Sequence, residues 1–394
     1  MTASEPTPSP ATPPPPAGAG SSGTEPTART AAPSVSGRRT RAIPSPVARR
    51  ATVIGAGSFG TALAVLLFRA GLRTTLQTRS AEQATLLDAK RENEAYLPGV
   101  ELPAQLRIEA VSEGVARADY VFLAVPSRGL GAAIAALQAG ELGRRTAIVS
   151  VAKGLVPPDG RPPTTVLSAM FGAQRVACVG GPAHAQEMVR SGAGLVVACR
   201  EEELSHTLAQ LFTRAGVVCE QSNDPIGVEL AGAAKNAAAL AAGATEAQGA
   251  NAVGAAAGHI FGEVWRYGEA LGARPESMIG LAGIGDLVAT ALAPESRNRR
   301  AGELLADGVP ALQIPSRIGQ AVEALEWVPL LARTLEQAGV EAPVTGALGR
   351  LISGELPLDE WVALVRTTVP PPARWRRPQP GFWRRVWRGL SRTR

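Results

Sequence analysis

The chain has 394 residues, of which 45% are hydrophobic, and this length is sufficient for two packed domains. Its formal net charge of +6 is unevenly distributed, because residues 366–394 hold nine Arg and no acid while residues 1–50 hold six Arg and two Glu, which leaves −7 for residues 51–365. An acidic central region argues against nucleic acid as its partner.

Residues 1–49 are rich in Pro, Ala, Ser and Thr, and such a segment buries too little apolar surface to offset the entropy of ordering, so we expect a disordered extension. A predicted strand covers residues 51–54, and a helix then runs to Ala70, where Gly71 ends it. The other apolar runs predict strands at 74–77, 120–125, 147–151, 175–179 and 195–198. Alternating strands and helices are typical of a parallel, doubly wound sheet, so we expect a Rossmann-like α/β domain over residues 50–222.

The pattern changes after residue 222, where long Ala-rich helical stretches replace the strand-like runs. The clearest stretch covers residues 228–247, and we expect an all-α domain over residues 223–365.

Residues 366–394 form a basic tail rich in Arg and Trp. Its apolar residues recur at helical spacing, and they are Phe382, Trp383, Val386, Trp387 and Leu390. Apolar residues opposite Arg are typical of a helix that lies in a membrane interface, so the tail is a candidate for peripheral membrane contact. The alternative is a disordered, solubilising tail.

The loop between the first strand and helix reads Gly55-Ala56-Gly57-Ser58-Phe59-Gly60. In this context Gly55 permits a tight turn, Gly57 lets the backbone approach a pyrophosphate, and Gly60 lets the helix pack on the sheet. The helix N-terminus then offers free N–H groups to the anion. The loop therefore predicts binding of NAD or NADP.

The end of the second predicted strand bears on the choice between these cofactors. An NAD-selective site usually offers Asp or Glu there, whereas this chain has Thr78-Arg79-Ser80. Arg79 is a candidate to hold the 2′-phosphate of NADP, and the alternative is a solvated surface Arg.

Two lysines and one aspartate are the candidates for chemistry. Lys153 follows a predicted strand, at the sheet edge where ligands bind in this fold. Lys235 lies in an otherwise small-residue, apolar helix, where desolvation would lower its pKa toward useful acid–base values; the alternative is a Lys on the exposed face. Asp286 stands in the Gly-flanked turn GIGDL, and a buried Asp needs a partner such as Lys235.

Ser296, Arg297 and Asn298 follow in the segment SRNRR. A hydroxyl, a guanidinium and an amide in succession form a candidate phosphate clamp, and the alternative is a basic surface loop. The three histidines share no motif and are weak candidates for a chemical role.

Together these segments resemble the bacterial NAD(P)-dependent glycerol-3-phosphate dehydrogenase family, from Thr52 to Leu364. The motifs that carry the resemblance, in order, are VIGAGSFGTALA (53–64), NEAYLPG (93–99), AVPS (124–127), AKGL (152–155), GGPAHAQE (180–187), GVELAGAAKN (227–236), GLAGIGDL (280–287), SRNRR (296–300) and IGQAVEA (318–324). The resemblance implies a Rossmann domain followed by a helical domain like the C-terminal domain of 6-phosphogluconate dehydrogenase. It also implies hydride transfer between NAD(P)H and dihydroxyacetone phosphate, which supplies sn-glycerol 3-phosphate for phospholipid synthesis.

The resemblance assigns a role to each site residue. Lys235 would be the proton donor to the ketone oxygen, Asp286 would hold that Lys and bind substrate, and Lys153 would contact substrate and cofactor. The other substrate-binding residues would be Gly181, Ala183, Ser296, Arg297 and Asn298. The cofactor-binding residues would be Gly55, Gly57, Ser58, Phe59, Gly60, Arg79, Lys153, Ala185, Arg297 and Glu323.

This chain departs from the family pattern at two places. Gly180-Gly181-Pro182-Ala183 stands where the family usually reads Ser-Gly-Pro-Ser or Ser-Gly-Pro-Thr, so Ala183 lacks a hydroxyl. Gly258-His259 replaces a typical Thr-Arg, which puts local packing or phosphate contacts in doubt.

Two other classes of function remain open on the sequence: a related Lys-dependent NAD(P) reductase of another small acid, and a non-catalytic nucleotide-sensing protein. The unpaired spacing of Cys178, Cys199 and Cys219 indicates free thiols rather than a disulfide framework or a metal site. Because no apolar stretch reaches the ~18–20 residues that span a bilayer, we expect a cytoplasmic protein. The sequence leaves open whether the chain forms a homodimer.

Overall fold

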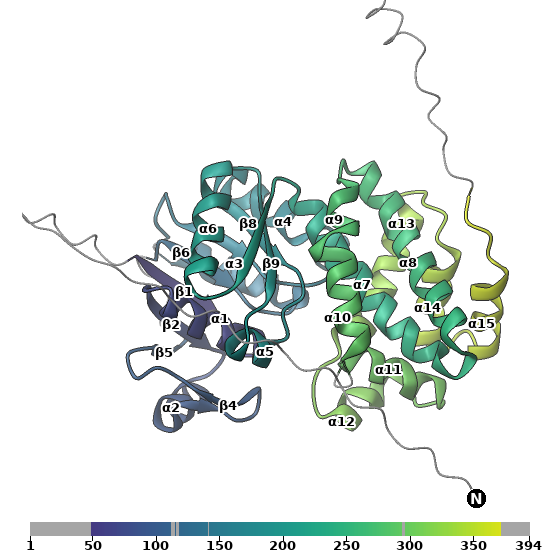
Figure 1. The fold of residues 1–394 in the computed structure, drawn as a ribbon, viewed down its shortest axis with the longest axis horizontal. Coiled ribbons are helices and arrows are strands. Elements are labelled where there is room, and N and C mark those ends of the chain that lie inside the picture. Colours follow the sequence, from purple (N-terminus) through teal and green to yellow (C-terminus); the bar gives the residue numbers. More distant parts are fainter. Residues whose placement is uncertain (1–48, 112–114, 116–117, 141, 294–295, 372–394) are drawn as a thin grey trace, which may run out of the picture. The chain divides into compact units, whose positions relative to one another are not determined.

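The computed structural model describes residues 49–371, apart from 112–114, 116–117, 141 and 294–295 (Figure 1). Most of the predicted N-terminal extension (1–49) and most of the predicted basic tail (366–394) therefore lie outside the described residues. Two regions follow one another along the described chain. We name them the sheet region, residues 49–222, and the helical region, residues 223–371.

The sheet region contains an eight-stranded sheet in the order β10-β9-β8-β7-β6-β1-β2-β5. Its strands are β1 (Arg50–Ile54), β2 (Arg73–Thr78), β5 (Arg107–Ala110), β6 (Tyr120–Leu123), β7 (Ala147–Ser150), β8 (Val176–Gly180), β9 (Gly194–Cys199) and β10 (Val218–Ser222). A separate hairpin consists of β3 (Glu92–Asn93) and β4 (Leu97–Glu101). The six predicted strands are all present. The apolar pattern did not predict β5, β10 or the hairpin, because polar or exposed residues interrupt it there.

The expectation of a parallel sheet is wrong at one pairing, because β8 and β9 run antiparallel. The helix between them, α5 (Ala185–Arg190), has six residues and rises only ~9 Å, whereas a crossover to a parallel strand must return over the ~16 Å of a five-residue strand. The chain therefore turns back instead of crossing over. Both strands are buried apolar runs, so their sequences carried no signal of direction.

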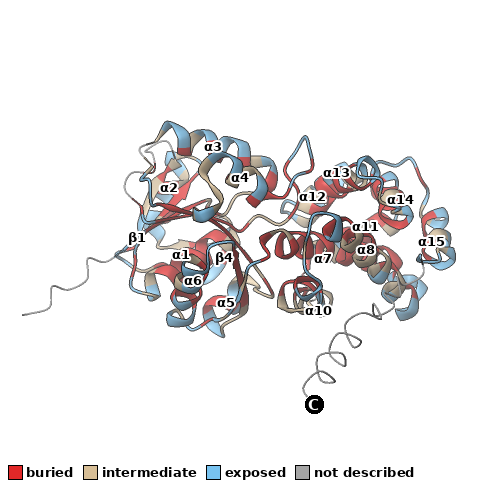
Figure 2. Cartoon of the chain, turned by 90° about the horizontal axis from the view of Figure 1, so that it is seen from above, coloured by how far each residue is buried: buried red, intermediate tan, exposed pale blue. Residues whose placement is uncertain are grey.

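Helices cover both faces of the sheet (Figure 2). One apolar core lies between the strands and helices α1 (Ser58–Arg69), α5 and α6 (Glu202–Arg214). A second core joins the opposite face to α3 (Leu130–Ala139) and α4 (Pro163–Phe171). Buried on both faces, the central strands are nearly all apolar, as expected for a parallel sheet. Helix α2 (Ala81–Lys90) follows β2.

The helical region is built around α7 (Pro225–Thr245), which matches the predicted helix and is buried along its length (Figure 2). Its Ala- and Gly-rich sequence permits this burial, because neighbouring backbones approach closely. A Cβ at Gly243 would lie 2.0 Å from the carbonyl oxygen of Arg299, and one at Gly302 would lie 2.0 Å from that of Leu240. The close approach presses the N-terminal end of α11 (Arg297–Ala306) against α7.

The remaining helices pack around this pair. They are α8 (Ala250–Ala270), α9 (Pro275–Ile279), the π-helical turn η5 (Leu281–Gly285), α10 (Asp286–Leu292), α12 (Ile314–Ile318), α13 (Glu323–Gln337), α14 (Pro343–Ile352) and α15 (Leu358–Thr367). Within the described part of the chain, no helix combines the length and hydropathy needed to cross a membrane.

Candidate active site

A cleft of about 810 Å³ opens between the carboxyl ends of the β-strands and the helical region. Its lining includes nearly all of the predicted site residues, and these are Gly55, Gly57, Ser58, Phe59, Gly60, Arg79, Lys153, Ala183, Ala185, Lys235, Asp286, Ser296, Arg297, Asn298 and Glu323. The chain segments that contribute them are up to 268 positions apart in sequence, from Gly55 to Glu323. The fold thus brings the nucleotide loop and the chemical candidates to one place.

The nucleotide loop connects β1 to α1 and faces the cleft. A Cβ at Gly55, where φ is +112°, would lie 2.4 Å from the carbonyl oxygen of Ala124, and one at Gly60 would lie 1.9 Å from that of Gly55. Gly57 instead has no atom within 4 Å of the position of a Cβ, so its backbone is open to a ligand. Helix α1 begins at Ser58 without a side-chain cap, which leaves its first N–H groups available to an anion.

Two lysines share one carboxylate on the wall of the cleft. Lys235 Nζ donates to Asp286 Oδ1 at 3.1 Å, and Lys153 Nζ donates to Asp286 Oδ2 at 2.9 Å. Asp286 is 1% exposed and Lys235 6% exposed. Lys235 comes from α7, Asp286 from the first residue of α10, and Lys153 from the loop after β7, so three separate elements form this cluster.

Burial determines the ionisation of this cluster. Desolvation, with a further contribution from the Lys153 cation, lowers the pKa of Lys235 to about 7, and the neighbouring Asp286 only partly opposes this shift. Burial raises the pKa of Asp286, but the ammonium groups of Lys153 and Lys235 outweigh it and hold that pKa below its ordinary value. An ammonium group that titrates near neutral pH is suited to proton transfer.

Thr290 is a site residue that the sequence motifs did not predict. Its hydroxyl oxygen accepts a hydrogen bond from Lys235 Nζ at 2.9 Å. Thr290 lies one helical turn after Asp286 on α10, so both side chains occupy one face of that helix. The spacing of four residues was therefore the signal that could have identified it.

The predicted phosphate clamp lies at the N-terminal end of α11. Ser296 caps this helix, Arg297 begins it, and all three clamp residues line the cleft. Asn298 Nδ2 donates to Asn236 Oδ1 at 2.9 Å, which links the clamp to the residue after Lys235. A guanidinium beside a helix N-terminus is a suitable site for a phosphate group.

Arg79 and Glu323 also line the cleft. Arg79 is exposed at the end of β2, and Glu323 begins α13. Burial raises the pKa of Glu323, although the nearby Arg297 and Lys153 cations oppose the shift. Arg297 itself donates to the carbonyl oxygen of Ala321 at 3.1 Å, so the start of α13 and the start of α11 meet here.

Gly181 is the predicted site residue that does not line the cleft. It is buried with φ at +102°, and a Cβ there would lie 2.4 Å from the carbonyl oxygen of Gly194. Its place in the fold is thus accounted for by the tight turn between β8 and α5. Ala183, two residues later, faces the cleft with a methyl group.

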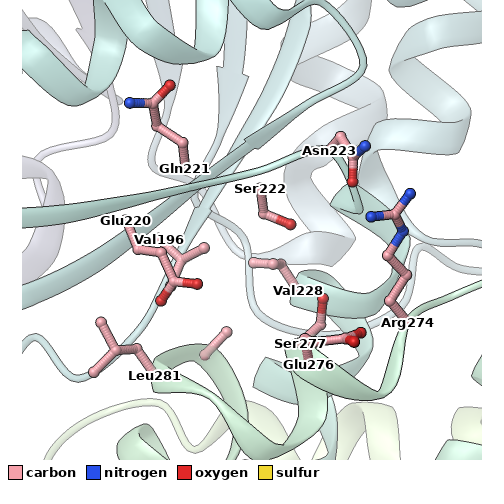
Figure 3. Close-up of a pocket in the computed structure, with 11 residues that line it drawn as sticks. Val196, Glu220, Gln221, Ser222, Asn223, Val228, Arg274, Glu276, Ser277 and Leu281 are labelled. Atoms are coloured by element: carbon pink, nitrogen blue, oxygen red, sulfur yellow. The ribbon is translucent and has the colours of Figure 1, made fainter.

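A second, smaller cavity of about 260 Å³ lies elsewhere, between β10, the start of α7 and the segment from α9 to η5 (Figure 3). Arg274, Glu220 and Glu276 bring charges to its wall. None of the predicted site residues lines it, and it lacks the paired lysines and the glycine loop of the larger cleft. The larger cleft is therefore the candidate active site.

Comparison with known proteins agrees with this geometry. The family models of NAD-dependent glycerol-3-phosphate dehydrogenase match residues 50–205 with their N-terminal part and residues 224–363 with their C-terminal part. Proteins named glycerol-3-phosphate dehydrogenase [NAD(P)+] include one from Deinococcus radiodurans, 38% identical over 307 residues (77% of this chain, 90% of the relative), and one from Thermus thermophilus, 40% identical over 308 residues (77% and 93%).

Solved structures lead to the same family. The crystal structure of glycerol-3-phosphate dehydrogenase from Coxiella burnetii is 28% identical, with a TM-score of 0.77 over 82% of this chain and 100% of that chain. A D-mandelate dehydrogenase structure with NADH, at 14% identity and a TM-score of 0.54 over 79% of this chain and 99% of that chain, shares the fold alone. The chain belongs to the NAD-dependent glycerol-3-phosphate dehydrogenase family.

Proposed function

We propose that this protein interconverts dihydroxyacetone phosphate and sn-glycerol 3-phosphate with NAD(P)H or NAD(P)+ as the hydride carrier. The observation that carries the proposal is the cluster of Lys235, Asp286 and Lys153 in a cleft that also contains a nucleotide loop and an anion-binding helix end. Family membership supports the same reaction.

The residues of the cleft fit a dinucleotide. The open backbone at Gly57 and the uncapped start of α1 suit a pyrophosphate, and they lie in one cleft with the lysine cluster. The residues that would hold the cofactor are Gly55, Gly57, Ser58, Phe59, Gly60, Arg79, Lys153, Ala185, Arg297 and Glu323. The cofactor supplies the hydride, and the protein supplies orientation and the proton.

Lys235 is the proposed proton donor. As negative charge develops on the ketone oxygen, the Lys235 ammonium group donates its proton there, and in the reverse direction the neutral amine accepts it. A pKa of about 7 makes both forms available at neutral pH. Asp286 and Thr290 bind Lys235 Nζ and orient it toward the cleft.

The phosphate of the substrate is assigned to the clamp. Ser296, Arg297 and Asn298 offer a hydroxyl, a guanidinium and an amide near the N-terminal end of α11, where the helix dipole favours an anion. Lys153 completes the substrate site as a second cation. Ala183 contributes only apolar contact, because it lacks the hydroxyl expected from the family pattern, and Gly181 supports the turn behind it.

Arg79 supports the use of NADPH. Its guanidinium lines the cleft at the end of β2, where an acidic residue would repel a 2′-phosphate, and no acidic residue stands beside it at Thr78 or Ser80. We propose that NADPH is used at least as well as NADH.

An assay with the full-length protein tests the reaction. Oxidation of NADPH or NADH, followed by absorbance, should require dihydroxyacetone phosphate and should be far slower with unphosphorylated dihydroxyacetone. Equal rates with the two ketones would reject both the phosphate-binding role of the clamp and the assignment of the substrate.

The location and partners of the protein form a separate proposal. We propose a cytoplasmic enzyme whose basic tail contacts anionic lipid, since each Arg near such a surface adds about 1 kcal/mol while residues 51–365, at −7, are repelled by it. Co-sedimentation with anionic and neutral vesicles, for the full chain and a truncation after Pro372, tests this. Binding to anionic vesicles that survives the truncation, or no binding by either protein, would reject the membrane contact. Light scattering of the same two proteins without vesicles shows whether the chain is a homodimer.

A further inference from the structure

The hairpin of β3 and β4 carries a buried polar side chain that the mechanism does not use. Asn93 is 2% exposed, and its Nδ2 donates two hydrogen bonds. One goes to the carbonyl oxygen of Ala56 at 3.0 Å, and the other goes to the hydroxyl oxygen of Thr61 at 2.8 Å. Both acceptors belong to the segment that forms the nucleotide loop and the first turn of α1.

These two contacts hold the loop at both of its ends. Ala56 lies inside the Gly-rich turn, before the open backbone of Gly57, and Thr61 lies in the first turn of α1, where its N–H donates to the carbonyl oxygen of Gly57 at 2.9 Å. A carbonyl oxygen only accepts hydrogen bonds, so the amide group of Asn93 must present its NH₂ to Ala56. A carboxylate of the same shape would offer only acceptors at this position.

The second strand of the hairpin, β4, is itself held by hydrogen bonds from α5. Gln186 Nε2 donates to the carbonyl oxygen of Pro98 at 3.0 Å, and Arg190 donates to that of Gly99 at 3.3 Å. Both donors belong to α5, which begins at Ala185 on the wall of the cleft. Tyr96, in the turn of the hairpin, also lines the cleft.

From this arrangement we infer that Asn93 is a positioning residue, which fixes the nucleotide loop in the geometry that binds the cofactor pyrophosphate. A loop held in advance loses less conformational freedom when the anion binds, so the contribution appears in cofactor affinity. Asn93 does not itself line the cleft, and it therefore acts through Ala56 and Thr61. The inference rests on the proposed use of a dinucleotide cofactor.

Three variants of the full-length protein test the inference: Asn93→Ala, Asn93→Asp and Thr61→Val. Titration calorimetry gives the Kd for ADP-ribose, which carries the pyrophosphate but no nicotinamide, and steady-state kinetics gives KM and kcat. Loss of both hydrogen bonds in Asn93→Ala should raise the Kd for ADP-ribose and the KM for NADPH on the order of tenfold. The kcat at saturating NADPH and the KM for dihydroxyacetone phosphate should stay within about threefold.

The other two variants rank the contacts. Asn93→Asp should bind ADP-ribose more weakly than Asn93→Ala, because it places an acceptor against the Ala56 carbonyl and adds negative charge near the pyrophosphate. Thr61→Val keeps the shape and the bond to Ala56, so its effect should be smaller than that of Asn93→Ala. An Asn93→Asp protein that binds ADP-ribose as well as the wild type would overturn the inference.

Two controls separate positioning from simple loss of stability. Glu94→Ala changes the next residue of the chain, which is exposed and pairs with Lys90 at the surface, and it should leave every constant unchanged. Ser277→Ala, in α9, removes a buried hydrogen bond to Asp224 at the start of α7, so it should lower the melting temperature without raising the Kd for ADP-ribose. If Asn93→Ala behaves like Ser277→Ala, Asn93 is structural only. If the wild type binds neither ADP-ribose nor NADPH, the proposed function itself is rejected.

Discussion

The ammonium groups of Lys153 and Lys235 meet on the two oxygens of a single carboxylate, that of Asp286. One buried anion therefore serves two cations, and the Lys153 cation helps to lower the pKa of Lys235. This shared carboxylate links the sheet region to the helical region at the point where substrate and cofactor would meet.

Replacing Lys235 tests its role as proton donor. Lys235→Ala should lower kcat by roughly 10²–10⁴, the usual range for general acid–base catalysis, while the Kd for cofactor changes little. Lys90→Ala is the matched control, since Lys90 is exposed on α2 and pairs with Glu94 at the surface. A Lys235→Ala enzyme within about threefold of the wild type would assign proton transfer to another group.

The kcat/KM values for ketone reduction and for alcohol oxidation should depend on pH in opposite ways. Reduction needs the protonated amine, so kcat/KM for dihydroxyacetone phosphate should be level below pH 7 and fall as pH rises through the Lys235 pKa of about 7. Oxidation of glycerol 3-phosphate needs the neutral amine and should rise through the same pH. Measurements of kcat/KM against pH, below and above pH 7, check the prediction. If the two reactions responded to pH in the same direction, the prediction would be contradicted.

Removing the charge of Lys153 should shift the pH at which the rate of reduction falls. The Lys153 cation disfavours protonation of Lys235 and also binds the carboxylate that stabilises the protonated form. In Lys153→Met both effects disappear, so the Lys235 pKa should rise and the alkaline limb of reduction should shift to higher pH, whatever the overall loss of rate. An alkaline limb that stays in place would show that the Lys153 cation does not contribute to the pKa of Lys235.

Arg297 is predicted to recognise the phosphate. At saturating cofactor, Arg297→Ala should cost about 1.5–3 kcal/mol in kcat/KM, the range for hydrogen bonds to charged groups, with dihydroxyacetone phosphate but not with unphosphorylated dihydroxyacetone. Arg300→Ala, from the same basic segment but outside the cleft, is the control. Unchanged kinetics for Arg297→Ala would make Arg297 a structural partner of Ala321 only.

Arg79 is predicted to select the cofactor. Arg79→Ala should raise the KM for NADPH more than the KM for NADH, because only NADPH carries the 2′-phosphate. Arg73→Ala removes an exposed guanidinium at the other end of β2 and should leave both constants unchanged. A larger effect on NADH than on NADPH would reject the role.

The sequence by itself determined the local features of this protein. The GAGSFG loop after a strand, the apolar strands and the Ala-rich helix are each properties of short segments, because periodicity, turn formation and helix propensity act over a few residues. For the same reason, the resemblance identified Lys235, Asp286 and the clamp from their neighbours along the chain.

Only the tertiary structure decided the relationships between segments. The direction of β9 depended on how the short α5 returns the chain, and β10 joined the sheet despite a polar, exposed sequence. Asn93 reads as an ordinary polar residue until the hairpin brings it against Ala56 and Thr61. Whether Lys235 was exposed or buried could not be known from its helix. Its pKa is lowered by burial and by the Lys153 cation, and α10, α11 and Lys153 are distant in sequence and pack against α7 or approach Lys235 only by folding.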